Sequence, residues 1–374
     1  MSLTGTPFFA VTLLVLVATM ALLAFVWNRI PGPRPVRYAG RLGATMFSQI
    51  AAVVVVLVYV NNSMGPFYDN WEDLFGGDAD QSATATNVGG GVSGVSDGHG
   101  AEKLRFRTYL PGVLQTSARG AASGVVGSLY VWLPPQYDDP AYAHTDFPVV
   151  ELLPGTPGTP QAWFGSMKIQ DAMAPLVAAG KVKPMILVAA KLNVLPGGVD
   201  PGCADVPGAA RTATWLSQDV PRLIAANFRT ARGPHNWALM GYSAGAYCAV
   251  NLAVQHPGVF HAAVSLSGYN APEAPLVLRD PVLARANNPY ELLRHEKKQP
   301  DIALLMAGSA QDPGTVPAAK ALLSVLHTPG PTNCSPWPVA ATPPTSGAPC
   351  SPTRSSGSPA DSADLPRAFR GPSV

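Results

Sequence analysis

The chain has 374 residues, a formal net charge of +2 and only 13% charged residues. It carries no basic stripe of the kind that binds nucleic acid, so we expect no nucleic-acid partner. The length leaves room for an α/β domain of more than 200 residues and additional segments.

The N-terminal region contains two apolar runs, Phe8–Trp27 and Leu42–Val60, each long enough to cross a bilayer as a helix. Four arginines and no acidic residue lie between them: Arg29, Arg34, Arg37 and Arg41. Short arginine-rich loops stay in the cytoplasm, so the pattern predicts a membrane anchor over residues 1–64, with the rest of the chain outside. A signal peptide is the alternative for the first run, but the run lacks a basic leading segment and a small-residue cleavage site. For the second run the alternative is a buried core segment, but no other fold signal adjoins it.

Residues 65–109 are predicted to be a flexible linker, because Gly76–Gly100 is rich in Gly, Ser, Asp and Thr and poor in apolar residues. The main domain is expected over residues 110–328. Its apolar runs predict strands at 125–133, 147–153, 184–190, 236–241, 262–268 and 302–308. Helical patterns lie at 166–179, 212–228, 244–256 and 318–327. Such alternation of strands and helices predicts a doubly wound, mostly parallel sheet of the α/β class.

One stretch of this domain, Asn236–Val250, combines a buried strand, the turn Gly241-Tyr-Ser243-Ala-Gly245 and a helix. That context is what the nucleophile elbow of an α/β-hydrolase requires, and it makes Ser243 the predicted nucleophile. The alternative is a structural Gly/Ser turn. Gly94–Gly98 also fits Gly-x-Ser-x-Gly, but it lies in the linker without a strand or a helix, so we interpret that match as chance.

An acyl-transfer site also needs an oxyanion hole, an acid and a base. The N–H groups of Ala244 and Thr156 are the predicted oxyanion donors, because one follows the nucleophile and the other follows an early strand. An ordinary Pro/Gly turn is the alternative for Thr156. Asp312 follows the strand at 302–308 and is the preferred acid over Asp280. The alternative is that Asp312 is a solvated aspartate in an ordinary turn before Pro313.

The base is harder to place. His327 is the only histidine after Asp312, and it ends a helix with no strand or glycine-rich loop to position it. We therefore assign no base from the chain as written.

The four cysteines, Cys203, Cys248, Cys334 and Cys350, have no metal-ligand spacing. A Cys203–Cys248 disulfide is possible if the domain is extracytoplasmic. Otherwise the cysteines are small buried hydrophobic residues.

From Tyr130 to His327 the chain resembles the esterase D / mycolyltransferase-type esterase family of α/β-hydrolases. The segments that carry the resemblance are Val131-Trp-Leu-Pro-Pro-Gln-Tyr-Asp, Leu152-Leu-Pro-Gly-Thr-Pro-Gly, Gln218-Asp-Val-Pro, Gly241-Tyr-Ser-Ala-Gly and Gly308-Ser-Ala-Gln-Asp. The resemblance implies hydrolysis or transfer of acyl esters without a metal or cofactor. The two apolar runs look like those of membrane-tethered bacterial relatives.

The chain departs from this family at two places. Pro154-Gly155 stands where members usually have His-Gly, which weakens the oxyanion assignment. The Gly-Gly-His segment that ends such proteins is missing, and residues 329–374 contain no histidine and no periodic apolar pattern.

A disordered tail is one interpretation of residues 329–374. We prefer a reading-frame error. Read from the third base of each codon, the segment from Pro331 permits His-Gln-Leu-Leu-Ala-Leu-Ala-Gly-Gly-Gly-His, which is a strand followed by a glycine-rich loop. The histidine that would serve as the catalytic base is then encoded across the codons of Ala341 and Thr342. We call the translation with this shift the frame-corrected chain.

The sequence thus predicts a membrane-anchored, extracytoplasmic serine esterase or acyltransferase that acts on a small-molecule or lipid acyl ester. The alternative is a catalytically inactive surface or binding protein that keeps the fold without the base histidine.

Overall fold

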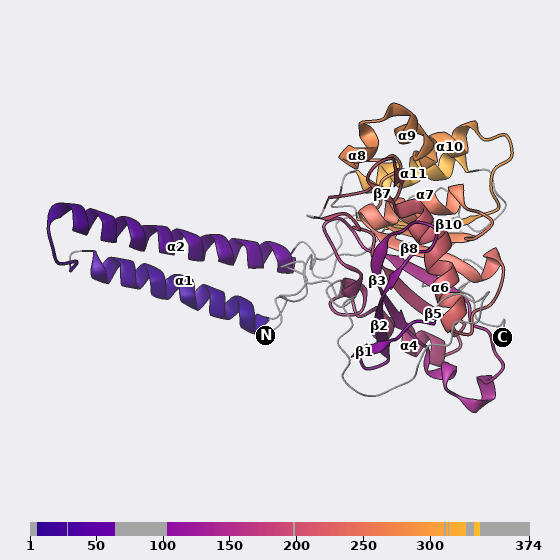
Figure 1. Ribbon diagram of the computed structural model, residues 1–374, viewed down its shortest axis with the longest axis horizontal. Coiled ribbons are helices and arrows are strands. Elements are labelled where there is room, and N and C mark those ends of the chain that lie inside the picture. The colour runs from indigo at the N-terminus through magenta and orange to yellow at the C-terminus, as the bar shows by residue number, and fades with distance from the viewer. Residues whose placement is uncertain are drawn as a thin grey trace, which may run out of the picture. The chain divides into compact units, whose positions relative to one another are not determined.

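The structure is a computed structural model that describes residues 6–27, 29–63, 103–196, 199–309, 312, 314–326 and 333–336. The chain divides into two compact units, Met1–Asp78 and Ala79–Val374 (Figure 1). Each unit is described by itself.

The first unit is a pair of packed helices, α1 (Thr6–Val26) and α2 (Arg34–Ser63). Both are long enough and contain a sufficiently apolar stretch to be candidate membrane spans, Pro7–Phe25 in α1 and Arg34–Asn61 in α2. α2 begins before the predicted apolar run because Pro35 is well suited to the first turn of a helix, where its missing N–H costs no hydrogen bond.

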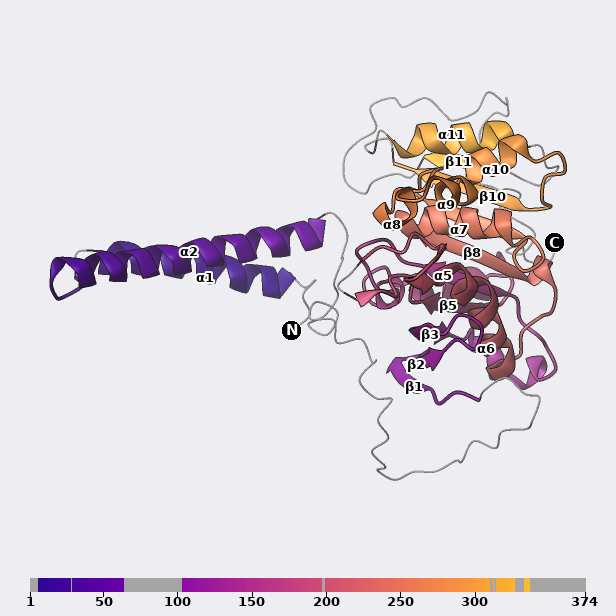
Figure 2. The ribbon, with the colours of Figure 1, turned by 45° about the horizontal axis from the view of Figure 1, so that its top comes forward.

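The second unit is built on a nine-stranded sheet in the order β1-β2-β3-β5-β4-β8-β9-β10-β11. Figure 2 shows this order running from β1 at the bottom to β11 at the top. The strands are β1 (Arg107–Leu110), β2 (Val113–Arg119), β3 (Val126–Trp132), β4 (Val149–Leu153), β5 (Ile186–Ala190), β8 (Trp237–Tyr242), β9 (Ala262–Leu266), β10 (Ala303–Gly308) and β11 (Asn333–Pro336). β1, β2 and β3 form an antiparallel edge, and the other six strands of the sheet, β5, β4, β8, β9, β10 and β11, are parallel. A two-stranded ribbon, β6 (Asp205–Val206) and β7 (Ala210–Arg211), lies apart from this sheet.

Helices cover both faces of the sheet. The described α-helices of this unit are α4 (Ile169–Ala178), α5 (Thr212–Thr214), α6 (Val220–Asn227), α7 (Ala244–Gln255), α8 (Pro275–Leu278), α9 (Pro281–Ala286), α10 (Pro289–His295) and α11 (Thr315–Val325). One apolar core joins α6, α7, α10 and α11 to the sheet, and a second joins α4 and the turn Pro160–Trp163 to the opposite face. The predicted α/β-hydrolase fold with a mostly parallel sheet is confirmed.

The strands and helices predicted in the domain are present with small shifts at their ends. The chain as written did not predict β1, β2, β6, β7 and β11, nor the short helices α8, α9 and α10. β1 begins at Arg107, inside the predicted linker, and only the shifted reading frame places a strand at β11. β2 is half polar (Val-Leu-Gln-Thr-Ser-Ala-Arg), so its apolar pattern is weak. α8, α9 and α10 each place Pro in the first turn and are too short to show a periodic pattern.

The predicted helix at 212–228 is interrupted by a π-helical turn, Trp215–Asp219, between α5 and α6. Asp219 is buried there and accepts hydrogen bonds from the N–H groups of Ala122 (2.9 Å) and Ser123 (2.8 Å). Its carboxylate therefore anchors the turn between β2 and β3. Asp219 has a structural role, although it belongs to a segment that carries the family resemblance.

Glu151 is a buried carboxyl group at the centre of β4. It is 0% exposed, and neither of its carboxyl oxygens has a hydrogen-bond partner among the described residues. Burial raises the pKa of Glu151 well above the ordinary carboxyl value, because the charged form is poorly solvated in the core. The folded state thus binds this proton more tightly than the unfolded state does, so this residue makes stability fall as pH rises above the ordinary carboxyl pKa.

Replacing Glu151 should consequently stabilise the protein at alkaline pH. We expect Glu151→Leu to raise the unfolding free energy by about 1–3 kcal/mol at pH 8, the usual cost of a buried unsatisfied polar group. The gain should shrink towards pH 4, where the folded wild-type carboxyl group is protonated and the unfolded one is mostly protonated. Urea unfolding followed by tryptophan fluorescence at the two pH values measures both differences. An equal gain at pH 4 and pH 8 would contradict the assigned cause.

Candidate active site

Ser243 occupies the turn between β8 and α7, with its backbone at φ 54° and ψ −122°. A positive φ is uncommon for a residue with a side chain and stores strain. Hydrogen bonds from the Ser243 N–H to the Leu266 carbonyl (3.0 Å) and from the Ala246 N–H to the Ser243 carbonyl (3.0 Å) hold it there. Ser243 is exposed, so its hydroxyl is accessible at the carboxyl edge of the parallel strands.

Two glycines allow this turn to form. A Cβ atom on Gly241 would lie 2.0 Å from the Gly245 carbonyl oxygen, and one on Gly245 would lie 2.2 Å from the Leu153 carbonyl oxygen. No larger residue fits at either position without moving the backbone. The close approach of strand and helix expected from the sequence is therefore present.

The loop after β4 lies against the same turn. A Cβ on Gly155 would be 2.9 Å from the Tyr242 ring and 3.2 Å from the Ser243 Cβ. Ala244 is the first residue of α7, and the first N–H groups of a helix have no partner within it. The structure thus brings the loop that carries Thr156 and the turn that carries Ala244 together beside Ser243.

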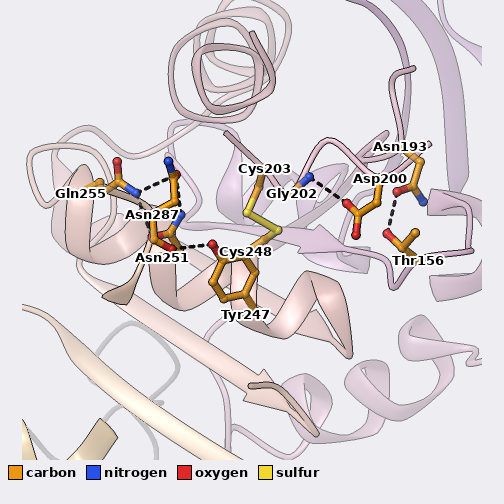
Figure 3. Close-up of a disulfide and its surroundings, with 10 residues drawn as sticks. All are labelled: Thr156, Asn193, Asp200, Gly202, Cys203, Tyr247, Cys248, Asn251, Gln255 and Asn287. Carbon is orange, nitrogen blue, oxygen red and sulfur yellow. Dashed lines mark hydrogen bonds between the residues drawn. A yellow bond between two sulfur atoms is a disulfide. The ribbon is translucent and has the colours of Figure 1, made fainter. Parts of the chain in front are cut away.

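Asn193, which follows β5, fastens this loop and had no assigned role from the sequence. Its Nδ2 group donates to the carbonyls of Gly155 (3.2 Å) and Gly158 (2.8 Å), and its Oδ1 accepts from the Thr156 hydroxyl (2.7 Å) (Figure 3). One amide thereby fixes the loop at three points. Its position after a parallel strand, at the edge where Ser243 lies, is the only signal in the sequence that points to it.

A disulfide joins Cys203 to Cys248, whose Cα atoms are 5.7 Å apart. It links the segment before β6 to α7, close to the turn that carries Ser243. In Figure 3 Asp200 lies between this disulfide and the pair formed by Asn193 and Thr156. Burial raises the pKa of Asp200, and its hydrogen bond from the Gly202 N–H partly offsets that effect. The disulfide that the sequence left as one alternative is the one present in the structure.

Asp312 follows β10 at the same edge of the sheet as Ser243. Its Oδ1 accepts from the Gly314 N–H at 3.3 Å, its side chain is exposed, and β9 separates its strand from that of Ser243. No hydrogen bond between Asp312 and Ser243 is present in the described part of the chain. Asp280, the rival acid, is the N-cap of α9 and accepts from the Val282 N–H (2.8 Å), which explains it as a structural residue.

The described histidines lie elsewhere. Each stands in a segment that leads into a strand, and hence towards the amino edge of the sheet: His144 before β4, His235 before β8, His256 and His261 before β9, and His295 before β10. His327 and His99 fall outside the described residues. Among the described residues, then, no histidine follows a strand at the carboxyl edge, where a base for the predicted nucleophile Ser243 would have to lie.

Comparison with known protein families identifies the family that the domain matches. Residues 127–321 match the family described as "Putative esterase". An uncharacterized protein of Corynebacterium glutamicum is 31% identical over 145 residues, which are 38% of this chain and 33% of that protein. The chain therefore matches about a third of the length of this curated relative.

Solved structures give a likeness of fold. A ferulic acid esterase superposes with a TM-score of 0.52 at 17% identity, covering 63% of this chain and 91% of that one. An S-formylglutathione hydrolase from Agrobacterium tumefaciens gives 0.45 at 15% identity, covering 63% and 90%. At such identities the first likeness is evidence for the fold alone.

Asn193 should matter for turnover and not for substrate capture. We expect Asn193→Ala in the frame-corrected chain to lower kcat for p-nitrophenyl acetate about 10- to 100-fold, because a shift of about 1 Å in a catalytic group has an effect of this size. KM should change little. Thr156→Val, which removes one of the three hydrogen bonds, should cause a smaller loss. An unchanged kcat in a folded Asn193→Ala protein would show that the loop keeps its place without this amide.

Proposed function

The chain belongs to the esterase family, and on this premise we propose that it cleaves acyl esters through an acyl-enzyme formed on Ser243. The observation that carries the proposal is the backbone of Ser243. A non-glycine residue at φ 54°, exposed between a parallel strand and a helix, is the arrangement that presents a nucleophilic hydroxyl to substrate.

The proposed reaction begins when the Ser243 Oγ attacks the ester carbonyl and a histidine takes the hydroxyl proton. The negative charge on the resulting tetrahedral oxyanion is stabilised by the N–H groups of Ala244 and Thr156. The intermediate then expels the alcohol, which takes the proton from the histidine. Water or an acceptor alcohol next attacks the acyl-enzyme while the histidine takes its proton, and the Ser243 Oγ regains that proton as the acid or the new ester leaves. Asp312 is the proposed acid that orients the histidine.

The position of β11 supports the frame-corrected chain as the source of that histidine. β11 pairs in parallel with β10, from Leu305 opposite Asn333 to Gly308 opposite Pro336. In the shifted frame these four positions read Leu-Leu-Ala-Leu, a more apolar strand sequence than Asn-Cys-Ser-Pro. The glycine-rich segment with its histidine follows directly, and residues that follow a parallel strand start from the carboxyl edge of the sheet.

We further propose that the enzyme is anchored in the cell membrane, with its catalytic domain outside the cytoplasm. α1 and α2 are the candidate spans, and the arginines lie between or at the start of them. The Cys203–Cys248 disulfide supports the same compartment, because disulfides persist in oxidising environments.

A second candidate is a binding protein with the fold but without catalysis. It is favoured by the absence of a described histidine at the carboxyl edge. An esterase that lacks one member of its triad retains little activity.

Activity measurements on two translations distinguish these candidates. We expect the frame-corrected chain to hydrolyse a p-nitrophenyl ester and its Ser243→Ala variant to lose at least about 1,000-fold in kcat, because loss of the nucleophile removes the acyl-enzyme route. The chain as written should be nearly inactive. Turnover that survives Ser243→Ala would exclude Ser243 as the nucleophile, and equal inactivity of both translations would favour the binding protein. Nucleotide sequencing provides an independent control: third bases that do not spell histidine in the shifted frame would exclude the frameshift.

The compartment has its own test. If the domain lies outside the cytoplasm, Cys203 and Cys248 should be bonded when thiols are trapped in intact cells before lysis. Peptide mapping by mass spectrometry would detect the linked pair. Complete alkylation of both thiols by the trapping reagent would place the domain in a reducing compartment instead.

A further inference from the structure

A cluster of metal-binding side chains lies at the amino edge of the sheet. His235 stands in a short turn, Pro234–Asn236, directly before β8, His261 immediately precedes β9, and Asp301 lies two residues before β10. β8, β9 and β10 are neighbouring parallel strands, so the residues that lead into them meet at one edge. We call His235, His261 and Asp301 the amino-edge cluster.

Backbone hydrogen bonds hold the three leading segments together. The His261 N–H lies 3.2 Å from the Pro234 carbonyl oxygen and 3.1 Å from that of Trp237. The Ala303 N–H donates to the His261 carbonyl at 2.7 Å. The cluster is thus built on the ordered beginning of the sheet and not on a free loop.

The side chains converge on one another. The imidazole rings of His235 and His261 have centroids 3.9 Å apart, and His261 Nδ1 lies 3.9 Å from Asp301 Oδ2. One nitrogen or oxygen from each of the three residues lies within 4.8 Å of the other two. Tetrahedral zinc with bonds of about 2.0–2.2 Å needs donors ~3.3–3.6 Å apart, so modest side-chain rotations would close the cluster on an ion.

One of the three side chains is held in place and the other two are exposed, which would allow them to close on an ion. The His261 side chain is only 14% exposed, and its Nδ1–H donates to the Asp301 carbonyl oxygen at 2.8 Å, which fixes the ring and leaves Nε2 as its metal-binding atom. His235 and Asp301 are exposed and are therefore able to rotate toward it. One fixed imidazole with two mobile donors leaves further coordination positions open to solvent.

We propose that the amino-edge cluster binds a divalent transition-metal ion such as Zn²⁺, at a site separate from Ser243. Two imidazoles and one carboxylate form a donor set that Zn²⁺ accepts readily. The remaining positions are available to water or a small anion. His235 and Asn236 also line a cavity of about 490 Å³, whose walls include both Lys183 and Asp146, so a water or small ligand on the ion would have room on that side.

The bound ion would stabilise the folded sheet. It would connect the beginnings of β8, β9 and β10, whose other ends lead to Ser243 and Asp312. Binding to the folded state alone raises stability by mass action, so the ion would stabilise the protein without entering the ester chemistry.

Zinc titration of the full-length protein in detergent tests this proposal. The protein is the chain as written, untagged, and carries Cys334→Ser and Cys350→Ser throughout, so that these thiols contribute no ligands. His235→Ala and Asp301→Asn each remove one donor from an exposed position, where folding is tolerant of the change. His295→Ala is the matched control, because His295 is a 72% exposed histidine beside one carboxylate, Glu291, at 2.9 Å.

We expect saturable binding of one Zn²⁺ per chain by calorimetry, with a higher melting temperature in the presence of the ion. Each cluster variant should bind at least about tenfold more weakly, since even loss of an outer-sphere partner costs 10- to 100-fold. The His295→Ala control should match the parent protein. Absence of saturable binding, or equal affinity in the parent and both cluster variants, would overturn the proposal and leave the three residues as a surface pair of histidines beside an aspartate.

Discussion

The close approach of the β8 and α7 backbones is the constraint on which the candidate site depends. Gly241 and Gly245 leave no space for a Cβ atom between strand, helix and the end of β4. This packing forces the chain to reverse within one residue, and Ser243 takes the positive φ that the reversal requires. The strain is held by neighbouring structure, namely the hydrogen bond to Leu266 on β9 and the first turn of α7. A looser turn would lower the strain and bury or misdirect the hydroxyl.

The rest of the site is arranged around this turn by separate strands of one sheet. The loop after β4 reaches Ser243 because β4 pairs with β8, and Asn193 reaches that loop because β5 pairs with β4. The disulfide fixes the segment after Asn193 to α7. β10 and β11 extend the same carboxyl edge beyond β9, which is where the proposed acid and base belong. The opposite ends of β8, β9 and β10 form the amino-edge cluster, so one set of strands connects both proposed sites.

The sequence predicted the parts of the molecule whose signal is local. β4, β5, β8, β9 and β10 are buried and mostly apolar, with Glu151 the one charged residue among them, and the elbow is identified by its glycines and its flanks. β2 escaped prediction because Gln115, Thr116 and Ser117 are tolerated near the sheet edge. Asn193 escaped because its partners Gly155 and Gly158 lie 38 and 35 residues away, and nothing in its own neighbourhood encodes them. Sequence left the Cys203–Cys248 pair open for the same reason. It gave His235 and His261 no role, because they become neighbours only when β8 and β9 pair.

Covalent labelling tests most directly whether Ser243 carries the acyl group. The frame-corrected chain would be treated with a fluorophosphonate, digested and analysed by peptide mass spectrometry. The account predicts one adduct per chain, on the peptide that contains Ser243, and a loss of esterase activity in proportion to labelling. Activity that persists in fully labelled protein, or an adduct on another residue that accounts for the inhibition, would contradict it.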